Sequence, residues 1–174
     1  DKAGKKEWLR TGHGSDSAFA IARSNGRAWA ATSLEREGDH FKMGFGKSSI
    51  EAEVRITARR DYILFELLDT RGGSVEEITF AQLPVRPAPH ASGLLNAKWS
   101  DEFAVCLMGL DPKVHAEFGP GAALRCEASR EFGLASHKAA LIAVPTPRFN
   151  VTVQEVEKDF NIPHATIGGE WAKT

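Results

Sequence analysis

Apolar and polar residues alternate with a period of two along most of the chain between residues 18 and 145. In EAEVRIT at 51–57, Ala52, Val54 and Ile56 alternate with charged residues, which is typical of a strand with one buried and one wet face. The pattern predicts strands at 18–23, 27–34, 41–45, 51–57, 61–69, 75–83, 102–108, 114–118, 123–128 and 139–145. Because no helical period intervenes, we predict an all-β fold, an antiparallel two-sheet β-sandwich of the jelly-roll or galactose-binding-like kind.

Two segments add detail to this sandwich. Asn25-Gly26 separates two predicted strands, and both residue types tolerate the positive φ of a type I′ turn, so we predict a hairpin there. DYILFELLD at 61–69 is apolar on both faces, which predicts a central strand. Ile63 and Phe65 are therefore expected to be core residues whose replacement by alanine destabilises the fold.

The hydrophobic period changes after the last predicted strand. In VTVQEVEKDF, Val153 and Val156 lie at helical spacing, which predicts one short C-terminal helix at 152–160. Thr152 and Glu155 have the spacing of a capping box at its start.

Length and charge limit the class of protein. The 174 residues fit one domain, 1–174, and the net charge is −1, which does not suit a strongly basic nucleic-acid module. No apolar run approaches the roughly 18 residues of a membrane span. We therefore expect neither a nucleic acid nor a membrane as partner.

Cys106 and Cys126 lack metal-ligand spacing and are expected to be buried thiols, with a disulfide between neighbouring strands as the alternative.

No catalytic or metal-binding constellation emerges from the sequence. GFGKSS at 44–49 has Phe41 where a phosphate-binding loop requires glycine, and it leads into a predicted strand rather than a helix. The six histidines are scattered, without metal-ligand spacing. Sandwich modules can carry a structural calcium ion, but no loop has the spacing of its Asp and Asn ligands. We therefore predict a domain that is not an enzyme and has no cofactor.

The candidate binding residues lie mostly in the segment 84–102, which we interpret as a long loop. Trp99 lies there among polar side chains, and an accessible tryptophan can stack on a sugar ring while planar polar groups bind the hydroxyls. Anchoring of the loop by Trp99 is the alternative. The predicted ligand-binding residues are Trp99, Asn96, Lys98, Asp101, Arg71, Arg86 and His90.

Several segments, in their order, resemble the N-terminal non-catalytic β-sandwich of large bacterial glycan-degrading enzymes. They are DYILFELLD, VEEITFAQLPV, EFAVCLMGLDPKV, EFGLASHKAALIAVPTPRF and NIPHATIGGEWAKT, and the resemblance extends from about residue 12 onward. It implies a domain similar to carbohydrate-binding modules that precedes a separate catalytic domain in a longer, secreted chain. A linker to that domain would start near GGEWAKT.

We therefore expect a carbohydrate-binding module that tethers a glycan-degrading enzyme to its polysaccharide, in an extracellular or periplasmic location. Its expected partners are a poly- or oligosaccharide and the catalytic domain of the same chain. The many arginines of the first half favour an acidic glycan, because guanidinium groups bind carboxylates and sulfates. Two alternatives stay open: an ancillary domain that packs on the catalytic domain, which an exposed apolar patch would favour, and a small β-sandwich lyase or hydrolase using Tyr62, the one tyrosine.

Overall fold

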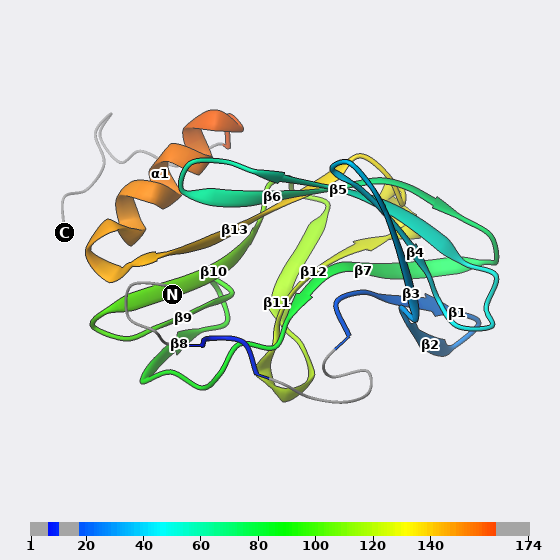
Figure 1. The fold of residues 1–174 in the computed structure, drawn as a ribbon, viewed down its shortest axis with the longest axis horizontal. Helices are drawn as coiled ribbons and strands as arrows, with labels where there is room; N and C mark the ends of the chain where they lie inside the picture. Colours follow the sequence, from blue (N-terminus) through cyan, green and yellow to red (C-terminus); the bar gives the residue numbers. More distant parts are fainter. Residues whose placement is uncertain (1–6, 11–17, 163–174) are drawn as a thin grey trace.

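The computed structural model describes residues 7–10 and 18–162. They form two antiparallel sheets packed face to face, with the helix α1 (Phe149–Asp159) on the outer face of the larger sheet (Figure 1). The five-stranded sheet has the order β11 (Val114–Phe118), β12 (Leu124–Ser129), β7 (Val75–Leu83), β1 (Ile21–Ser24) and β2 (Arg27–Ala30). The eight-stranded sheet has the order β3 (Ser33–Glu37), β4 (His40–Gly44), β5 (Glu51–Ala58), β6 (Tyr62–Arg71), β13 (His137–Pro145), β10 (Phe103–Gly109), β9 (Ala97–Trp99) and β8 (His90–Ser92). The predicted two-sheet antiparallel sandwich with one short C-terminal helix is confirmed.

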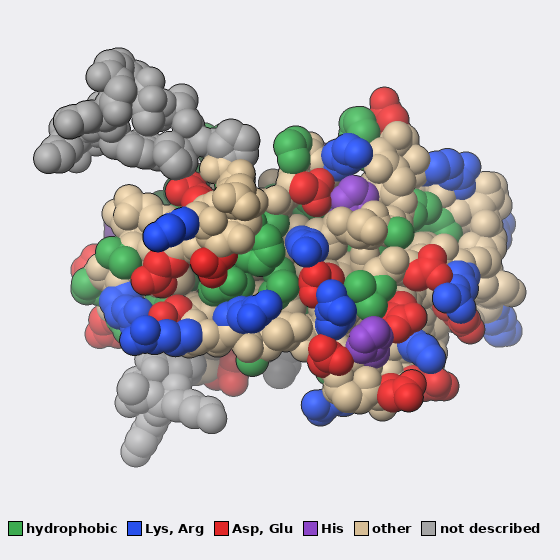
Figure 2. All heavy atoms as spheres, turned by 90° about the horizontal axis from the view of Figure 1, so that it is seen from above, with side chains coloured by type: hydrophobic (Ala, Val, Ile, Leu, Met, Phe, Trp, Pro, Cys, Tyr) green, Lys and Arg blue, Asp and Glu red, His purple; other side chains and the backbone are tan. Residues whose placement is uncertain are grey.

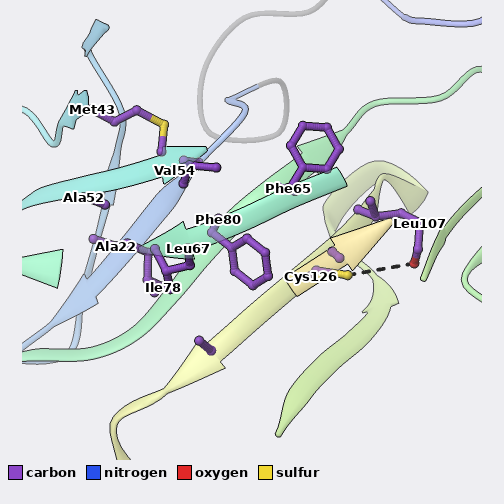
Figure 3. Packing of buried hydrophobic residues seen from close by; sticks show 14 of the residues in the cluster. Ala22, Met43, Ala52, Val54, Phe65, Leu67, Ile78, Phe80, Leu107 and Cys126 are labelled. Carbon is purple, nitrogen blue, oxygen red and sulfur yellow. Dashed lines mark hydrogen bonds between the residues drawn. The ribbon is translucent and has the colours of Figure 1, made fainter. Parts of the chain in front are cut away.

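The core between the sheets consists of the inward-facing residues of both. Figure 3 shows Val54 and Leu67 of the larger sheet packed with Ile78 and Phe80 of the smaller one, and all four are fully buried. Successive side chains of a strand point to opposite faces, so alternation in the sequence selects the residues that enter this core.

A second apolar layer lies between α1 and the outer face of the larger sheet. Val156 of α1 is fully buried there, with Leu64 of β6 and Ala140 and Ile142 of β13. The two strands are apolar on both faces because the smaller sheet covers one face and α1 covers the other. β6 lies between β5 and β13, so the prediction of a central strand is confirmed.

The predicted Asn25-Gly26 hairpin has the expected geometry, and the segment after β4 has the expected successor. Asn25 and Gly26 join β1 and β2, with φ of 52° and 69°, as a type I′ hairpin requires. The GFGKSS segment leads from β4 into β5, so a strand follows it, as predicted.

The strand predicted at 27–34 is two strands, β2 and β3, in different sheets. Ala31 N donates to Ala20 O beside β1, whereas Thr32 N donates to Gly44 O of β4, each at 2.9 Å. The chain therefore crosses from one sheet to the other between two consecutive residues. Hydrophobic alternation does not reveal this crossing, because the period of two continues through it.

The segment 84–102 is not a structureless loop, because it contains β8 and β9. These strands of three residues pair with each other, and β9 also pairs with β10. Trp99 is therefore a strand residue. Strands of this length contain too few residues for alternation to predict them.

The helix begins at Phe149 rather than at Thr152. The 3-10 turn Thr146–Arg148 leads directly into it, and Arg148 at the N-cap makes no side-chain capping bond. Thr152 is fully buried within the helix, so the predicted capping box of Thr152 and Glu155 is wrong. Arg148 and Phe149 already have right-handed helical φ and ψ, so the helix continues from the 3-10 turn without a side-chain cap.

Candidate functional site

The structure brings two of the predicted binding residues into contact. His90 and Trp99 are opposite each other in the β8–β9 hairpin, and their rings stack with centroids 5.6 Å and planes 26° apart. His90 is exposed, whereas Trp99 is half-buried and packs against the apolar layer beneath α1. Trp99 thus holds the hairpin against the sandwich, while part of its side chain stays accessible.

Asn96 and Lys98 point into the protein. Asn96 is 1% exposed, and its Nδ2 donates to Leu107 O at 2.7 Å and to Arg125 O at 3.1 Å. Lys98 is 4% exposed, its Nζ donates to Val85 O at 3.0 Å, and burial lowers its pKa. Both side chains therefore have partners inside the sandwich and do not flank the Trp99 ring.

The remaining predicted residues lie apart. Arg86 is exposed and its Nε donates to Leu9 O at 3.2 Å, and Asp101 is exposed in the bend between β9 and β10. Arg71 is the last residue of β6, and its Nε lies 2.5 Å from Asp69 Oδ2. It is far from Trp99, because β13 and β10 lie between β6 and β9 in the sheet. The predicted residues do not form a single cluster.

A different group of side chains converges at the turn between β5 and β6. This turn consists of Arg59, Arg60, Asp61 and Tyr62, and a hydrogen bond from Arg59 N to Tyr62 O (2.9 Å) closes it. We call it the Tyr62 turn. Its four residues line two adjoining hollows, the helix-side hollow of about 580 Å³ and the strand-side hollow of about 330 Å³.

The two hollows differ in their other walls. The helix-side hollow is completed by the end of α1, through Glu155, Asp159 and Phe160. The strand-side hollow is completed by Ile63, by the end of β13 and by the 3-10 turn that follows, through Leu141, Ala143, Val144, Pro145 and Arg148. Apolar side chains therefore form its floor, and Arg148 adds a guanidinium group from a distant part of the sequence.

Tyr62 is held in place between the hollows. Its hydroxyl donates to Asp159 Oδ2 at 3.0 Å, and its ring meets Phe160 edge-on, with centroids 6.3 Å apart and planes at 71°. Burial, and then the bond to Asp159, raise the pKa of Tyr62 above its usual value. The tyrosine is the first residue of β6, at the end of the strand rather than in its middle.

Asp61 links two arginines of this site. Its Oδ2 lies 3.6 Å from Arg60 Nε and 3.1 Å from Arg148 Nη2. The Asp61 side chain is only 14% exposed, whereas those of Arg60 and Arg148 are 91% and 49% exposed. Figure 2, which views the molecule from the side that carries α1, shows acidic and basic side chains interspersed over this face, so an excess of one sign on this face is local.

The Tyr62 turn is not among the binding residues that the sequence predicts. The available signal is the run Arg59-Arg60-Asp61-Tyr62, which places the one tyrosine beside two arginines at a predicted turn. The contribution of Arg148 has no sequence signal, because it depends on the position of the turn after β13.

A third hollow, of about 690 Å³, is mainly apolar. It lies between α1, β10, β11 and the β8–β9 turn, and its wall includes Leu94, Leu95, Met108, Phe149 and Val153. Leu94 and Leu95 are 95% and 54% exposed. We call this feature the leucine groove.

Neither cysteine has the properties of a nucleophile. Both are free and buried, as the first of the two interpretations predicted. Burial raises the pKa of the Cys106 thiol to about 12 and that of Cys126 well above its usual value. Both therefore remain protonated at neutral pH. In the described part of the chain, no three His, Cys, Asp or Glu side chains gather as a metal site.

Glu66 is a buried carboxylate on the outer face of the larger sheet. Its side chain is 9% exposed, and its two oxygens lie 2.7 Å from Arg55 Nε and 3.1 Å from Lys138 Nζ. The hydrogen bond from Arg55 holds the pKa of Glu66 below its usual value, against the opposite effect of burial.

We expect Glu66→Gln to lower the free energy of unfolding by about 1–3 kcal/mol at pH 7, because charge-assisted hydrogen bonds are lost. The folded-state pKa of Glu66 is lower than the unfolded one, so its stabilisation is present above the unfolded pKa and disappears as the pH falls through the folded pKa. Urea denaturation of both proteins between pH 7 and pH 2 measures this effect. A difference between them that stays constant over this range would contradict the prediction.

No family model, curated protein or solved structure matches the chain. Among the described residues, no helix has the length and apolar character needed to cross a membrane.

Proposed function

We propose that this β-sandwich is a non-catalytic carbohydrate-binding module that tethers a glycan-degrading enzyme to its polysaccharide, and that the sugar binds at the Tyr62 turn. The observation that carries the proposal is the position of Tyr62 between two hollows with guanidinium and carboxylate groups around it. The C–H faces of a sugar ring pack on an aromatic ring, while planar polar side chains bind the hydroxyls.

The rigidity of the site supports this role. Tyr62 is fixed by its bond to Asp159 and by Phe160, so little side-chain freedom is lost when a ligand binds. The protonated, buried thiols are compatible with the extracellular or periplasmic location that such a tether requires, because a buried thiol is slow to oxidise.

Binding assays with Tyr62→Ala and Trp99→Ala test the proposal. The wild-type protein is first screened against soluble polysaccharides, and the dissociation constant of the best one is measured by calorimetry. We expect Tyr62→Ala to weaken binding about ten- to a hundredfold, as for other aromatic stacking platforms. Trp99→Ala should bind as the wild type does, provided that circular dichroism shows both variants folded.

Each contrary outcome has a distinct meaning. A wild-type protein that binds no polysaccharide in the screen would overturn the proposed function. Binding that Trp99→Ala abolishes and Tyr62→Ala leaves intact would move the site to the His90–Trp99 pair, where the sequence alone placed it.

The leucine groove favours a second candidate function, an ancillary domain that packs on the catalytic domain of a longer chain. Exposed leucines beside an apolar hollow are typical of surfaces that another protein surface covers. In a full-length chain, replacing Leu94 and Leu95 by serine would then lower the melting temperature of the catalytic domain. A tethering module would instead lose no catalytic-domain stability on this change.

A further inference from the structure

The two hollows beside the Tyr62 turn differ in charge. Three guanidinium groups and one carboxylate line the strand-side hollow, through Arg59, Arg60, Arg148 and Asp61. In the helix-side hollow, the same two turn arginines face three carboxylates, those of Asp61, Glu155 and Asp159. A chain whose net charge is −1 thus has a local positive excess on one side of Tyr62 and a negative excess on the other.

Asp61 orients two of the basic groups and neutralises only one of the three positive charges. Its carboxylate is mostly buried and contacts one nitrogen each of Arg60 and Arg148, whose side chains extend to the surface. A guanidinium group has five N–H donors in a planar fork, so one contact leaves further donors for a ligand. Arg59 forms no ion pair with any residue that the structure describes.

The apolar floor of the strand-side hollow adds a second requirement. Ile63 is 38% exposed and lies beside Leu141, Ala143 and Pro145. A free inorganic anion would gain nothing from these side chains, whereas an anionic group on a sugar ring would place C–H groups against them. Guanidinium forks match the geometry of a carboxylate or a sulfate ester.

We propose that the strand-side hollow binds the carboxylate or sulfate of an acidic polysaccharide through Arg59, Arg60 and Arg148, with the C–H groups of its sugar ring against Ile63 and Leu141. This inference rests on the proposed function and specifies its substrate class. The carboxylates of the helix-side hollow repel an anion, so they fix the direction in which the charged unit enters.

Matched pairs of polymers test the charge requirement and distinguish its two sources. One pair is polygalacturonate and its methyl-esterified form, and the other is dextran sulfate and dextran. We expect the wild-type protein to bind a charged member at least about tenfold more tightly than its neutral partner, with an affinity that falls as salt is added. Preference within the first pair identifies a carboxylate ligand, and preference within the second identifies a sulfate.

Single arginine variants locate the effect. We expect Arg148→Gln and Arg59→Gln each to weaken binding of the charged polymer about tenfold, because a charge-assisted contact is lost. Arg59→Gln removes no described ion pair, so it tests binding without an effect on folding. Arg27→Gln is the control: it removes the same charge from an exposed position on β2, at the opposite end of the molecule from α1 (Figure 1).

Failure of this inference differs from failure of the proposed function. If the wild-type protein bound carbohydrate but showed no preference for the charged polymer in either pair, the module would still bind carbohydrate, and the anion site would be wrong. Equal losses of affinity in Arg148→Gln, Arg59→Gln and Arg27→Gln would likewise overturn it, because the affinity would then depend only on the net charge of the protein and not on a particular site. Absence of binding to every polymer would overturn both.

Discussion

Replacement of Phe65 by alanine is expected to lower the free energy of unfolding by about 3–5 kcal/mol, because a large buried side chain is lost and a cavity is left. Phe65 is 4% exposed and lies in the core between the two sheets, where its ring centroid is 5.7 Å from that of Phe19. Guanidinium chloride denaturation, followed by circular dichroism, measures the change.

Ile63→Ala is the matched control on the same strand. Both residues belong to the apolar run of β6, and the sequence predicts a core position for each. The structure corrects this for Ile63, which is 38% exposed at the strand-side hollow, so its replacement should cost about 1 kcal/mol or less. Equal losses for the two variants would contradict the assigned burial.

Asn96→Asp is expected to lower the free energy of unfolding by a similar amount, about 3–5 kcal/mol at pH 7. The side-chain amide of Asn96 donates to Leu107 O on β10 and to Arg125 O on β12, so it connects the two sheets. An aspartate of nearly the same shape would place a buried negative charge against two carbonyl oxygens, without a counterion.

The pH dependence of this variant separates charge from packing. Burial raises the pKa of a carboxyl group, so the introduced carboxylate would bind a proton more readily in the folded than in the unfolded protein. The cost of Asn96→Asp should therefore shrink as the pH falls from 7 to 4 and grow as the pH rises. Asn150→Asp, at an exposed position in the first turn of α1, makes the same substitution and should leave stability almost unchanged. A loss in Asn96→Asp that does not change with pH would contradict the argument.

The sequence predicts most of this fold because burial on one face of a strand imposes a period of two. β5 shows this most clearly, since Ala52, Val54 and Ile56 all contribute to the core as predicted. The prediction fails where the period carries no information. The crossing after Ala31 keeps the same period in both sheets, and β8 and β9 are too short to show one.

The candidate site was less predictable than the fold. Trp99 and His90 lie in one hairpin, and their contact follows from local pairing. The inward orientation of Lys98 follows from the register of β9, which the sequence did not reveal. The strand-side hollow forms only because Arg148 lies beside Asp61. These two residues are far apart in the sequence, and the pairing of β13 with β6 brings them together.

The position of β13 has a consequence for synthesis of the protein. β13 is the last strand of the described chain, yet it lies in the middle of the larger sheet, between β6 and β10. While the ribosome makes residues 110–136, the strands β3 to β6 and β8 to β10 exist without the strand that joins them. The sides of β6 and β10 that β13 later covers are then unpaired, and such strand edges readily associate with other chains. The nascent sandwich is therefore most exposed to aggregation just before its last strand emerges, and insertion of β13 closes both edges at once.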